Sequence, residues 1–339
     1  MMSNKAKLRW GILGAARINQ QLMPAIVEAE NSELIAIASR RPGAAAETLA
    51  KYAPEQKDVT IYDNPESLLA DDSIQAVYIP LANKEHANWA LRAIEHGKHV
   101  LCEKPMALTV TDIEAIEAAA NKHNVTVMEG FMYRFHPQHA RVKEILDSGV
   151  IGEVRSVRSC FSYLMQPARE YRIDNTIENG SGAMWDIGCY AIHAARLPFY
   201  NETPIAITAM AKHISSGADI SCNGIIDFGD GKYAHFDFGF EHARRAEYEI
   251  IGTKGGLKCH NVWAKQAETP VISWWTETGD QNQEILAIAN HFRLEVEHFS
   301  HCVLNNKPVQ LSIEDAKTNC KVINAALESV KTKQQVTIG

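Results

Sequence analysis

The sequence predicts an α/β protein in which a doubly wound parallel sheet is followed by a large, open, mostly antiparallel sheet. Over roughly the first 130 residues, short apolar strands alternate with amphipathic helices, which is typical of a parallel sheet covered on both faces. From Gly152 onward the strands are longer and alternate apolar with polar residues, as in a sheet with one exposed face. The length of 339 residues agrees with about two domains.

The first half of the chain supplies the parallel sheet. We expect strands at residues 8–13, 34–39, 59–62, 76–80, 99–102 and 125–129, because each is a short apolar run between turn residues. The helices expected between them cover residues 17–30, 42–52, 84–96 and 111–123. A proline opens the second helix, Gly97 ends the third, and Thr109 or Thr111 can cap the fourth.

A helix over residues 136–147, ending at Gly149, separates the two halves. Alternating strands are expected at residues 153–163, 204–214, 223–231, 232–240 and 244–252, with turn signals at Asp230-Gly231 and Gly255-Gly256. Helices are expected over about 183–197, 283–304 and 313–331. We therefore divide the chain into a first domain, 1–130, and a second, 131–339, whose C-terminal helix can pack back on the first.

Composition and charge exclude several kinds of partner. Lys and Arg total 34 and Asp and Glu total 41, a formal net charge of −7, so we expect no nucleic acid. Apolar runs of about 18 residues are absent, so we expect no membrane span. The polar N-terminus and seven widely spaced cysteines indicate a cytoplasmic protein without a disulfide framework. The 14 histidines are scattered, and we expect no metal.

A glycine turn follows the first expected strand. Gly14 can make the tight turn of a dinucleotide-binding fingerprint, while Ala16 and Asn19 stand where the fingerprint has its second and third glycines. A turn that serves packing alone is therefore an equal alternative. The turn precedes a helix N-terminus, whose backbone N–H groups suit a pyrophosphate. Gly14, Ala16, Arg17 and Ile18 are our candidate contacts to it.

The end of the second strand indicates which dinucleotide would bind. NAD-binding proteins usually carry an Asp or Glu there, which accepts a hydrogen bond from the ribose 2′-OH. Here the strand ends in Ser39, Arg40 and Arg41, and Glu33 lies at its other end. Guanidinium groups suit the 2′-phosphate of NADP. We therefore predict NADP, with NAD as the alternative if the two arginines are only solvated.

Two further groups of residues could carry chemistry. Glu103 and Lys104 come directly after a buried strand, where ligands of open α/β sheets bind, although a surface loop is the alternative. Asp186, Tyr190 and His193 are spaced i, i+4 and i+7 and share one helical face. That face is either a polar solvent face or a site that binds sugar hydroxyls and moves a proton.

Together these residues resemble the glucose–fructose oxidoreductase / inositol dehydrogenase (Gfo/Idh/MocA) family over nearly the whole chain. The resemblance rests on the glycine turn, Glu103-Lys104-Pro105, Asp186-x-x-x-Tyr190, and the segments 79–86 and 131–137. It implies a Rossmann domain, a second domain with an open sheet, a nicotinamide cofactor, and a sugar or polyol substrate. Tyr190 stands where many members have His. A tyrosine at this position is similar to the dimeric dihydrodiol dehydrogenase and NADP-dependent xylose dehydrogenase branch.

The resemblance also implies roles for single residues. Lys104 would bind the reacting oxygen, and Tyr190 would exchange the proton, for which a tyrosine needs a neighbouring cation. Asp186 would orient Lys104 or bind an adjacent hydroxyl. The resemblance adds Pro80, Leu81, Asn83, His86 and Glu103 as contacts to the cofactor, and Tyr133, Arg134, Trp185 and His193 as contacts to the substrate. The open sheet implies a homodimer or homotetramer.

Two alternatives stay open at the level of sequence. A nicotinamide-dependent glycosidase would use the same groups but regenerate its cofactor in each cycle, whereas a dehydrogenase consumes it. A non-catalytic NAD(P)-binding regulator would not need Lys104, Asp186 and Tyr190, all of which are present.

Overall fold

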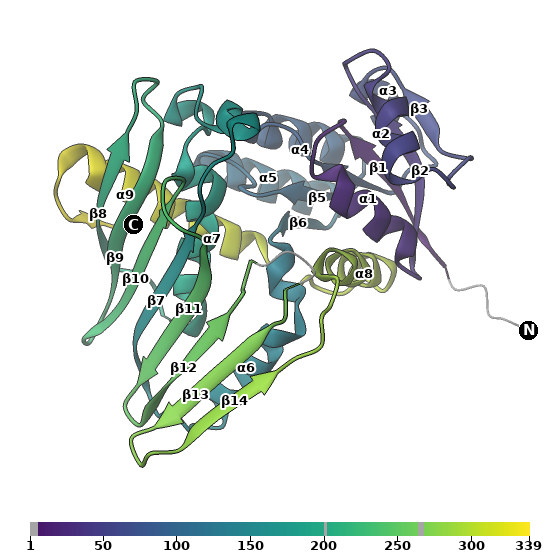
Figure 1. Ribbon diagram of the computed structural model, residues 1–339. Helices are drawn as coiled ribbons and strands as arrows, with labels where there is room; N and C mark the ends of the chain where they lie inside the picture. Colours follow the sequence, from purple (N-terminus) through teal and green to yellow (C-terminus); the bar gives the residue numbers. More distant parts are fainter. Residues whose placement is uncertain (1–5, 200–201, 264–267) are drawn as a thin grey trace, which may run out of the picture. The chain divides into compact units, whose positions relative to one another are not determined.

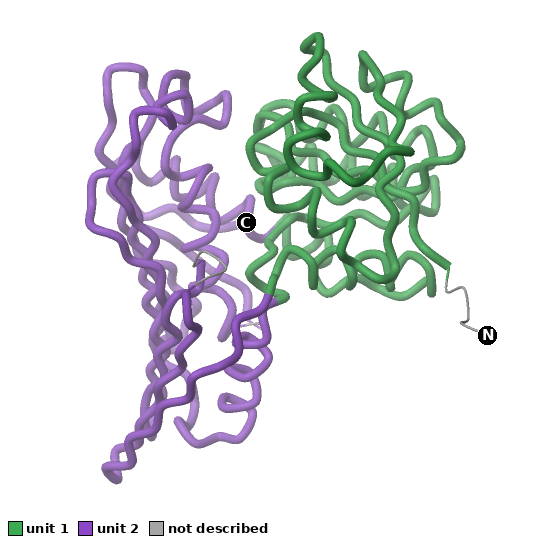
Figure 2. Tube along the Cα trace, turned by 45° about the vertical axis from the view of Figure 1, so that its right-hand side comes forward, with its two compact units in different colours: residues 1–135, 290–317 green, residues 136–289, 318–339 purple. Residues whose placement is uncertain are grey.

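The computed structural model describes residues 6–199, 202–263 and 268–339. The chain divides into two compact units, which are coloured separately in Figure 2. Unit 1 comprises Met1–Phe135 and Asn290–Lys317, and unit 2 comprises His136–Ala289 and Thr318–Gly339. The predicted domains 1–130 and 131–339 differ from these units, because residues 290–317 group with the first part of the chain.

Unit 1 is built on a parallel sheet that has six strands in the described part of the chain, in the order β3-β2-β1-β4-β5-β6 (Figure 1). The strands are β1 (Leu8–Leu13), β2 (Ser32–Ala38), β3 (Thr60–Tyr62), β4 (Ala76–Ile79), β5 (His99–Glu103) and β6 (Val127–Gly130). This is the doubly wound order of dinucleotide-binding folds, in which ligands bind at the carboxyl ends of the strands where the order reverses. Here the order reverses between β1 and β4.

Helices and short 3-10 turns connect these strands. They are α1 (Asn19–Glu28), α2 (Ala44–Tyr52), α3 (Pro65–Leu69), η1 (Asn83–Glu85), α4 (His86–Glu95), α5 (Val110–His123) and η2 (Met132–Phe135). Of the two threonines considered as caps, Thr109 caps α5, and its side chain accepts a hydrogen bond from the Asp112 amide. Helix α3 was not predicted, although Asn64 caps it and a proline follows, which is a local signal for a helix start.

A distant segment completes unit 1. Helix α8 (His291–Leu304) packs beside α1 (Figure 1). The Trp10 and Phe299 rings lie 5.2 Å apart, and Trp10 Nε1 donates to Ser300 Oγ at 3.2 Å. The prediction of a helix from residue 283 was wrong at its start, because Asn290 caps α8 and residues 281–285 form a strand.

Unit 2 contains a sheet that has nine strands among the residues described, in the order β14-β13-β12-β11-β7-β10-β9-β8-β15. The strands are β7 (Val154–Ser162), β8 (Ala206–His213), β9 (Asp219–Gly229), β10 (Lys232–Gly239), β11 (Arg245–Gly252), β12 (Gly255–His260), β13 (Val271–Thr276), β14 (Gln281–Ile285) and β15 (Val336–Thr337). Neighbouring strands are antiparallel except β7 and β10. The predicted fold class is therefore confirmed. The turn expected at Gly255-Gly256 was wrong, since both residues belong to β12 and pair with β13.

Helices cover one face of this sheet. Those that contact its strands are α6 (Pro137–Asp147), η5 (Met184–Gly188), α7 (Cys189–Arg196), η6 (Leu197–Phe199) and α9 (Ile313–Thr332), most of which belongs to unit 2. Unit 2 also contains η3 (Pro167–Arg172) and η4 (Ile177–Asn179). Helix α7 packs on β7 and β10, whereas α6 contacts β13, where the Arg141 guanidinium lies over the Trp274 ring. The opposite face carries the exposed side chains of Met210, Ile225 and Tyr233 on three adjacent strands.

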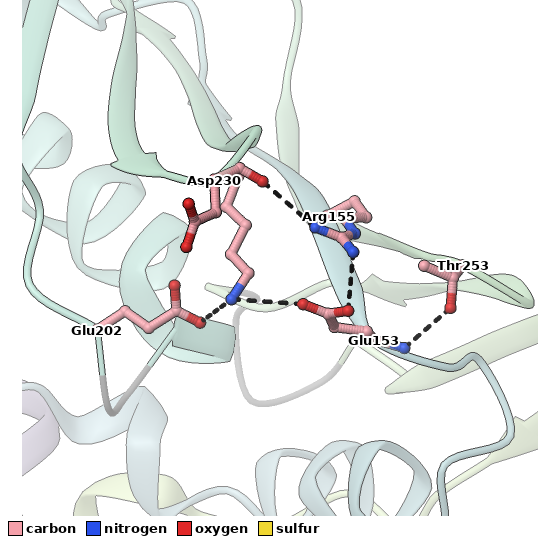
Figure 3. A network of polar contacts seen from close by, with 6 residues as sticks. Glu153, Arg155, Glu202, Asp230 and Thr253 are labelled. Atoms are coloured by element: carbon pink, nitrogen blue, oxygen red, sulfur yellow. Dashed lines mark hydrogen bonds and ion pairs between the residues drawn. The ribbon is translucent and has the colours of Figure 1, made fainter.

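A network of charged side chains lies at the start of β7 and β10 in unit 2 (Figure 3). Lys232 Nζ lies 2.8 Å from Glu202 Oε1 and 3.5 Å from Glu153 Oε1, and Arg155 joins Glu153 to the carbonyl of Asp230. Because most of these groups are partly exposed, each pair contributes little to stability. We interpret the network as structural. Within the described residues, no helix is long and apolar enough to cross a membrane.

Candidate active site

The glycine turn after β1 has a backbone conformation that favours glycine and packs closely against Leu81. Gly14 has φ 141°, and a Cβ at this position would lie 2.8 Å from Leu81 Cδ2. Asn19 is completely buried, and its Nδ2 donates to the Gly14 carbonyl at 2.8 Å. Asn19 therefore fixes the turn from inside, which explains a polar residue where the fingerprint has a glycine. In the described chain no side chain caps the start of α1, and the amides of its first residues, Asn19, Gln20 and Gln21, donate to backbone carbonyls of the turn.

Of the two predicted arginines, Arg41 contacts this turn, whereas Arg40 pairs with an acid. Arg41 Nη2 donates to the carbonyl of Ala15 at 2.8 Å, and the Arg41 amide donates to Ser39 Oγ at 3.1 Å. Arg40 Nη2 lies 2.6 Å from Glu85 Oε1. The sequence analysis missed Glu85, because it lies 45 residues away from Arg40 and meets it only across the sheet.

His86 connects two loops at the same edge of the sheet. Its ring is buried, with Nδ1 2.7 Å from the Pro105 carbonyl and Nε2 3.0 Å from the Leu81 carbonyl. Burial is the main cause that lowers the pKa of His86. Both ring nitrogens face backbone acceptors, so the side chain holds the two loops together. Its predicted contact with a cofactor stays a prediction.

Lys104 follows β5 and is half-buried. The carboxylate beside it is held in place, because Tyr78 donates its hydroxyl proton to Glu103 Oε1 at 2.5 Å. Two more acids lie in this part of unit 1. Glu129 Oε1 accepts from the Met106 amide at 2.7 Å, and Glu295 of α8 is buried. Burial, with a smaller contribution from Glu103, raises the pKa of Glu295 well above its ordinary value.

In unit 2 the helix predicted over 183–197 forms without a break, but it is not an α-helix throughout. It begins as the π-helical turn η5 and becomes α-helical only at Cys189. Asp186, Tyr190 and His193 are 8%, 7% and 1% exposed, so the alternative of a polar solvent face is wrong. Gly188 allows this packing, because a Cβ there would lie 2.5 Å from Cζ of Phe238.

Asp186 forms an ion pair with Arg172 of η3, which the sequence analysis did not single out. The Tyr163 hydroxyl donates to Asp186 Oδ2 at 3.4 Å, and the Arg169 guanidinium lies over the Tyr163 ring. A guanidinium beside a carboxylate favours the ionised acid. Asp186 is therefore suited to accept hydrogen bonds from substrate hydroxyls.

Tyr190 lies in an aromatic cluster. Its ring centroid is 5.9 Å from that of Phe161 and 6.3 Å from that of Trp263, and these two rings stack on each other. Two other predicted substrate contacts are also buried. Trp185 donates its indole N–H to the Ile177 carbonyl at 3.0 Å, and Tyr133 of unit 1 has no exposed surface. Arg134, the remaining predicted substrate contact, is half-buried in η2, and Gln310 Nε2 donates to its carbonyl.

Asp219 supports the start of η5. Its Oδ2 accepts a hydrogen bond from the Met184 amide at 2.8 Å, while no partner among the described residues reaches its buried Oδ1. Burial raises the pKa of Asp219 to about 7. Gly182 packs directly on this carboxyl with φ 105°, and a Cβ would fall on Oδ1. The sequence gives no local signal for Asp219, because the contact is made between η5 and β9.

Family models match both halves of the chain. Residues 8–131 match the oxidoreductase family with an NAD-binding Rossmann fold, and residues 139–258 match the GFO/IDH/MocA C-terminal domain. The chain therefore belongs to the Gfo/Idh/MocA oxidoreductase family, and the predicted resemblance is confirmed. Among described residues, no group of three or more His, Cys, Asp or Glu side chains is placed to hold a metal ion.

The chain is also similar to individual proteins over nearly its whole length. The chain is 33% identical over 333 residues to D-xylose 1-dehydrogenase (NADP(+)) 2 of Haloferax volcanii, covering 98% of this chain and 100% of that protein. It is 27% identical to trans-1,2-dihydrobenzene-1,2-diol dehydrogenase of Xenopus laevis, covering 95% and 98%. A solved 3-ketoreductase from Actinomadura kijaniata, in complex with NADP and TDP-benzene, superimposes with a TM-score of 0.87 at 30% identity, covering 95% and 98%. Variants of this ketoreductase with a replaced lysine or a replaced tyrosine have also been solved.

Proposed function

We propose that the protein is an NADP-dependent oxidoreductase that transfers a hydride between the nicotinamide and a CH–OH or C=O group of a sugar or polyol. The proposal is supported by the glycine turn after β1, where Arg41 Nη2 donates to the Ala15 carbonyl, and by Arg40, which follows β2. Gly14 has φ 141°, a backbone conformation that favours glycine, and two guanidinium groups suit a 2′-phosphate. The relatives named for D-xylose with NADP(+) and for a dTDP-linked sugar support the same substrate class.

In this proposal the bound nicotinamide supplies or accepts the hydride. Lys104 holds the reacting oxygen by a hydrogen bond and favours negative charge on it. Tyr190 gives a proton to that oxygen during carbonyl reduction and takes it back during alcohol oxidation. Asp186, kept ionised by Arg172, accepts from a neighbouring hydroxyl and so orients the sugar. Lys104 belongs to unit 1 and Tyr190 to unit 2.

Replacement of Lys104 tests its role. We expect Lys104→Ala to lower kcat by at least about 100-fold while the Kd for NADPH changes less than about threefold, since the lysine would act on the reacting oxygen. Lys122→Ala, which removes an exposed lysine of the same unit, serves as the control. Turnover in Lys104→Ala equal to that of the control contradicts the assignment.

The pH dependence of turnover tests Tyr190. Tyr190→Phe keeps the ring within its aromatic cluster but removes the exchangeable proton. We expect kcat to fall at least about 100-fold and the ionisation assigned to the tyrosine to vanish from the pH–rate profile. Tyr233→Phe removes an exposed phenol and is the matched control. A wild-type pH–rate profile in Tyr190→Phe would exclude the proposed proton transfer.

Titration of the protein with NADPH and with NADH, followed by tryptophan fluorescence, tests the cofactor. We expect NADPH to bind at least about tenfold more tightly. Equal or tighter binding of NADH would contradict the assignment of Arg40 and Arg41. If neither dinucleotide binds, the proposed function is wrong.

Net consumption of cofactor during turnover separates the dehydrogenase from the glycosidase alternative.

We also infer that two copies of the chain associate through the open face of the sheet in unit 2. Met210, Ile225 and Tyr233 are 67%, 43% and 42% exposed on the adjacent strands β8, β9 and β10. An apolar group of this kind on a sheet face is typical of an interface. Light scattering should give the mass of a dimer or tetramer, and Met210→Lys should lower it. A monomer mass for the unaltered protein would refute the inference.

A further inference from the structure

The ion pair between Arg40 and Glu85 joins two ends of the parallel sheet. Arg40 follows β2, Glu85 ends the 3-10 turn η1 after β4, and β1 lies between these strands. Arg40 Nη2 and Glu85 Oε1 are 2.6 Å apart. The pair therefore bridges the carboxyl ends of β2 and β4, on either side of the strand that leads into the glycine turn. It brings an acid to the place where the sequence showed only arginines.

The two partners differ in how firmly they are held. The Glu85 amide donates to the Ala82 carbonyl at 2.7 Å, and the next residue, His86, is buried between two backbone carbonyls. The Glu85 side chain is 25% exposed, whereas that of Arg40 is 56% exposed. When the ion pair opens, we expect the Glu85 carboxylate to stay in place and the Arg40 guanidinium to move. An ion pair so exposed to solvent is weak and can be opened by a stronger acceptor.

The charges at this point bear on the two nicotinamide dinucleotides in opposite ways. The 2′-phosphate of NADP is an anion that would compete with the Glu85 carboxylate for Arg40 and would be repelled by it. The ribose 2′-OH of NAD is neutral and can donate a hydrogen bond to a carboxylate in this part of the fold. Arg41, tied to the Ala15 carbonyl, is the second cation available to the phosphate.

We propose that Glu85 is a specificity-determining residue that reduces the preference of the protein for NADP over NAD. It does so by occupying Arg40 and by placing a negative charge beside the 2′ position of the ribose. This inference rests on the proposed function, since it concerns the same cofactor site. It assigns a specificity role to a residue that follows neither the glycine turn nor the second strand.

Equilibrium binding of the two dinucleotides to the full chain tests the inference. In Glu85→Gln, we expect the Kd for NADPH to fall roughly fivefold and that for NADH to stay equal or rise, because one opposing unit charge is removed. The ratio of the two constants should therefore change about five- to tenfold. Arg40→Ala should weaken NADPH at least about tenfold and leave NADH within about threefold. Glu95→Gln, an exposed glutamate at the end of α4, is the control.

A double variant shows whether Glu85 acts through Arg40. In the Arg40→Ala background, Glu85→Gln should tighten NADPH less than it does in the wild type, because competition for the guanidinium is gone. A ratio within twofold of wild type in Glu85→Gln, or weaker NADPH binding, overturns the inference while leaving the proposed function intact. Failure of the unaltered chain to bind either dinucleotide overturns both.

Discussion

Asp219 should make the stability of unit 2 fall as the pH rises from about 4 to about 7. Its side chain is 1% exposed, and burial raises its pKa from 3.8 to about 7. Between these values the folded chain holds a proton that the unfolded chain has released. The unfolded state therefore binds fewer protons, and the free energy of unfolding decreases with rising pH. Below pH ~4 and above pH ~7, both states carry the same charge at this group and its contribution is constant.

The expected magnitude follows from the same two values. A difference of about three pKa units corresponds to about 4 kcal/mol of unfolding free energy between the two ends of the range. The value is large because burial removes the carboxylate from water, and the hydrogen bond from the Met184 amide to Oδ2 offsets only part of that cost. Asp219→Asn keeps an acceptor for the Met184 amide but cannot ionise.

Urea unfolding at several pH values between about 4 and 8 isolates this contribution. We expect the free energy of unfolding of the wild type, minus that of Asp219→Asn, to decrease by about 4 kcal/mol across the range. The Met184 amide donates a hydrogen bond to Asp219, so its rate of hydrogen exchange measures the local stability of this part of unit 2. Asp174→Asn alters an exposed aspartate of the same unit and is the control. A wild-type minus Asp219→Asn difference that is flat with pH would refute the reasoning.

Three further replacements test single contacts. Gly182→Ala should destabilise unit 2 by about 3 kcal/mol or prevent folding, because φ is 105° and the new Cβ would fall on a buried carboxyl oxygen; an unchanged melting temperature speaks against this. Gly14→Ala should raise the Kd for NADPH at least about tenfold, since φ is 141° and an alanine would shift the turn proposed to bind the cofactor; fluorescence titration checks it, and wild-type affinity would count against a role of this turn in binding. His86→Ala should lower stability by about 2 kcal/mol, because it removes a buried ring whose nitrogens lie 2.7 Å and 3.0 Å from the carbonyls of Pro105 and Leu81, and wild-type resistance to urea would disprove this.

The parallel sheet could be predicted closely from sequence because its signals are local. The strand expected at 8–13 is β1, and the helix expected at 111–123 differs from α5 by one residue. Apolar runs, caps and turn residues act over a few neighbouring positions, so they can be read along the chain. Strand β14 was missed for the opposite reason. Its sequence is polar, and its pairing with β13 makes it a strand.

The sequence by itself determined the fold class, the family and the short motifs in which Lys104, Asp186 and Tyr190 occur. Only the tertiary structure decided what surrounds them. Glu85 reaches Arg40 across β1, Arg172 pairs with Asp186 from a separate turn, and Asp219 supports η5 from a strand. Charge pairing and desolvation depend on the distance between groups in space. That distance cannot be read from their separation along the chain until the order of the strands in the sheet is known. The motifs therefore indicate the proposed chemistry, whereas the contacts formed on folding determine the charged partners of the residues in those motifs.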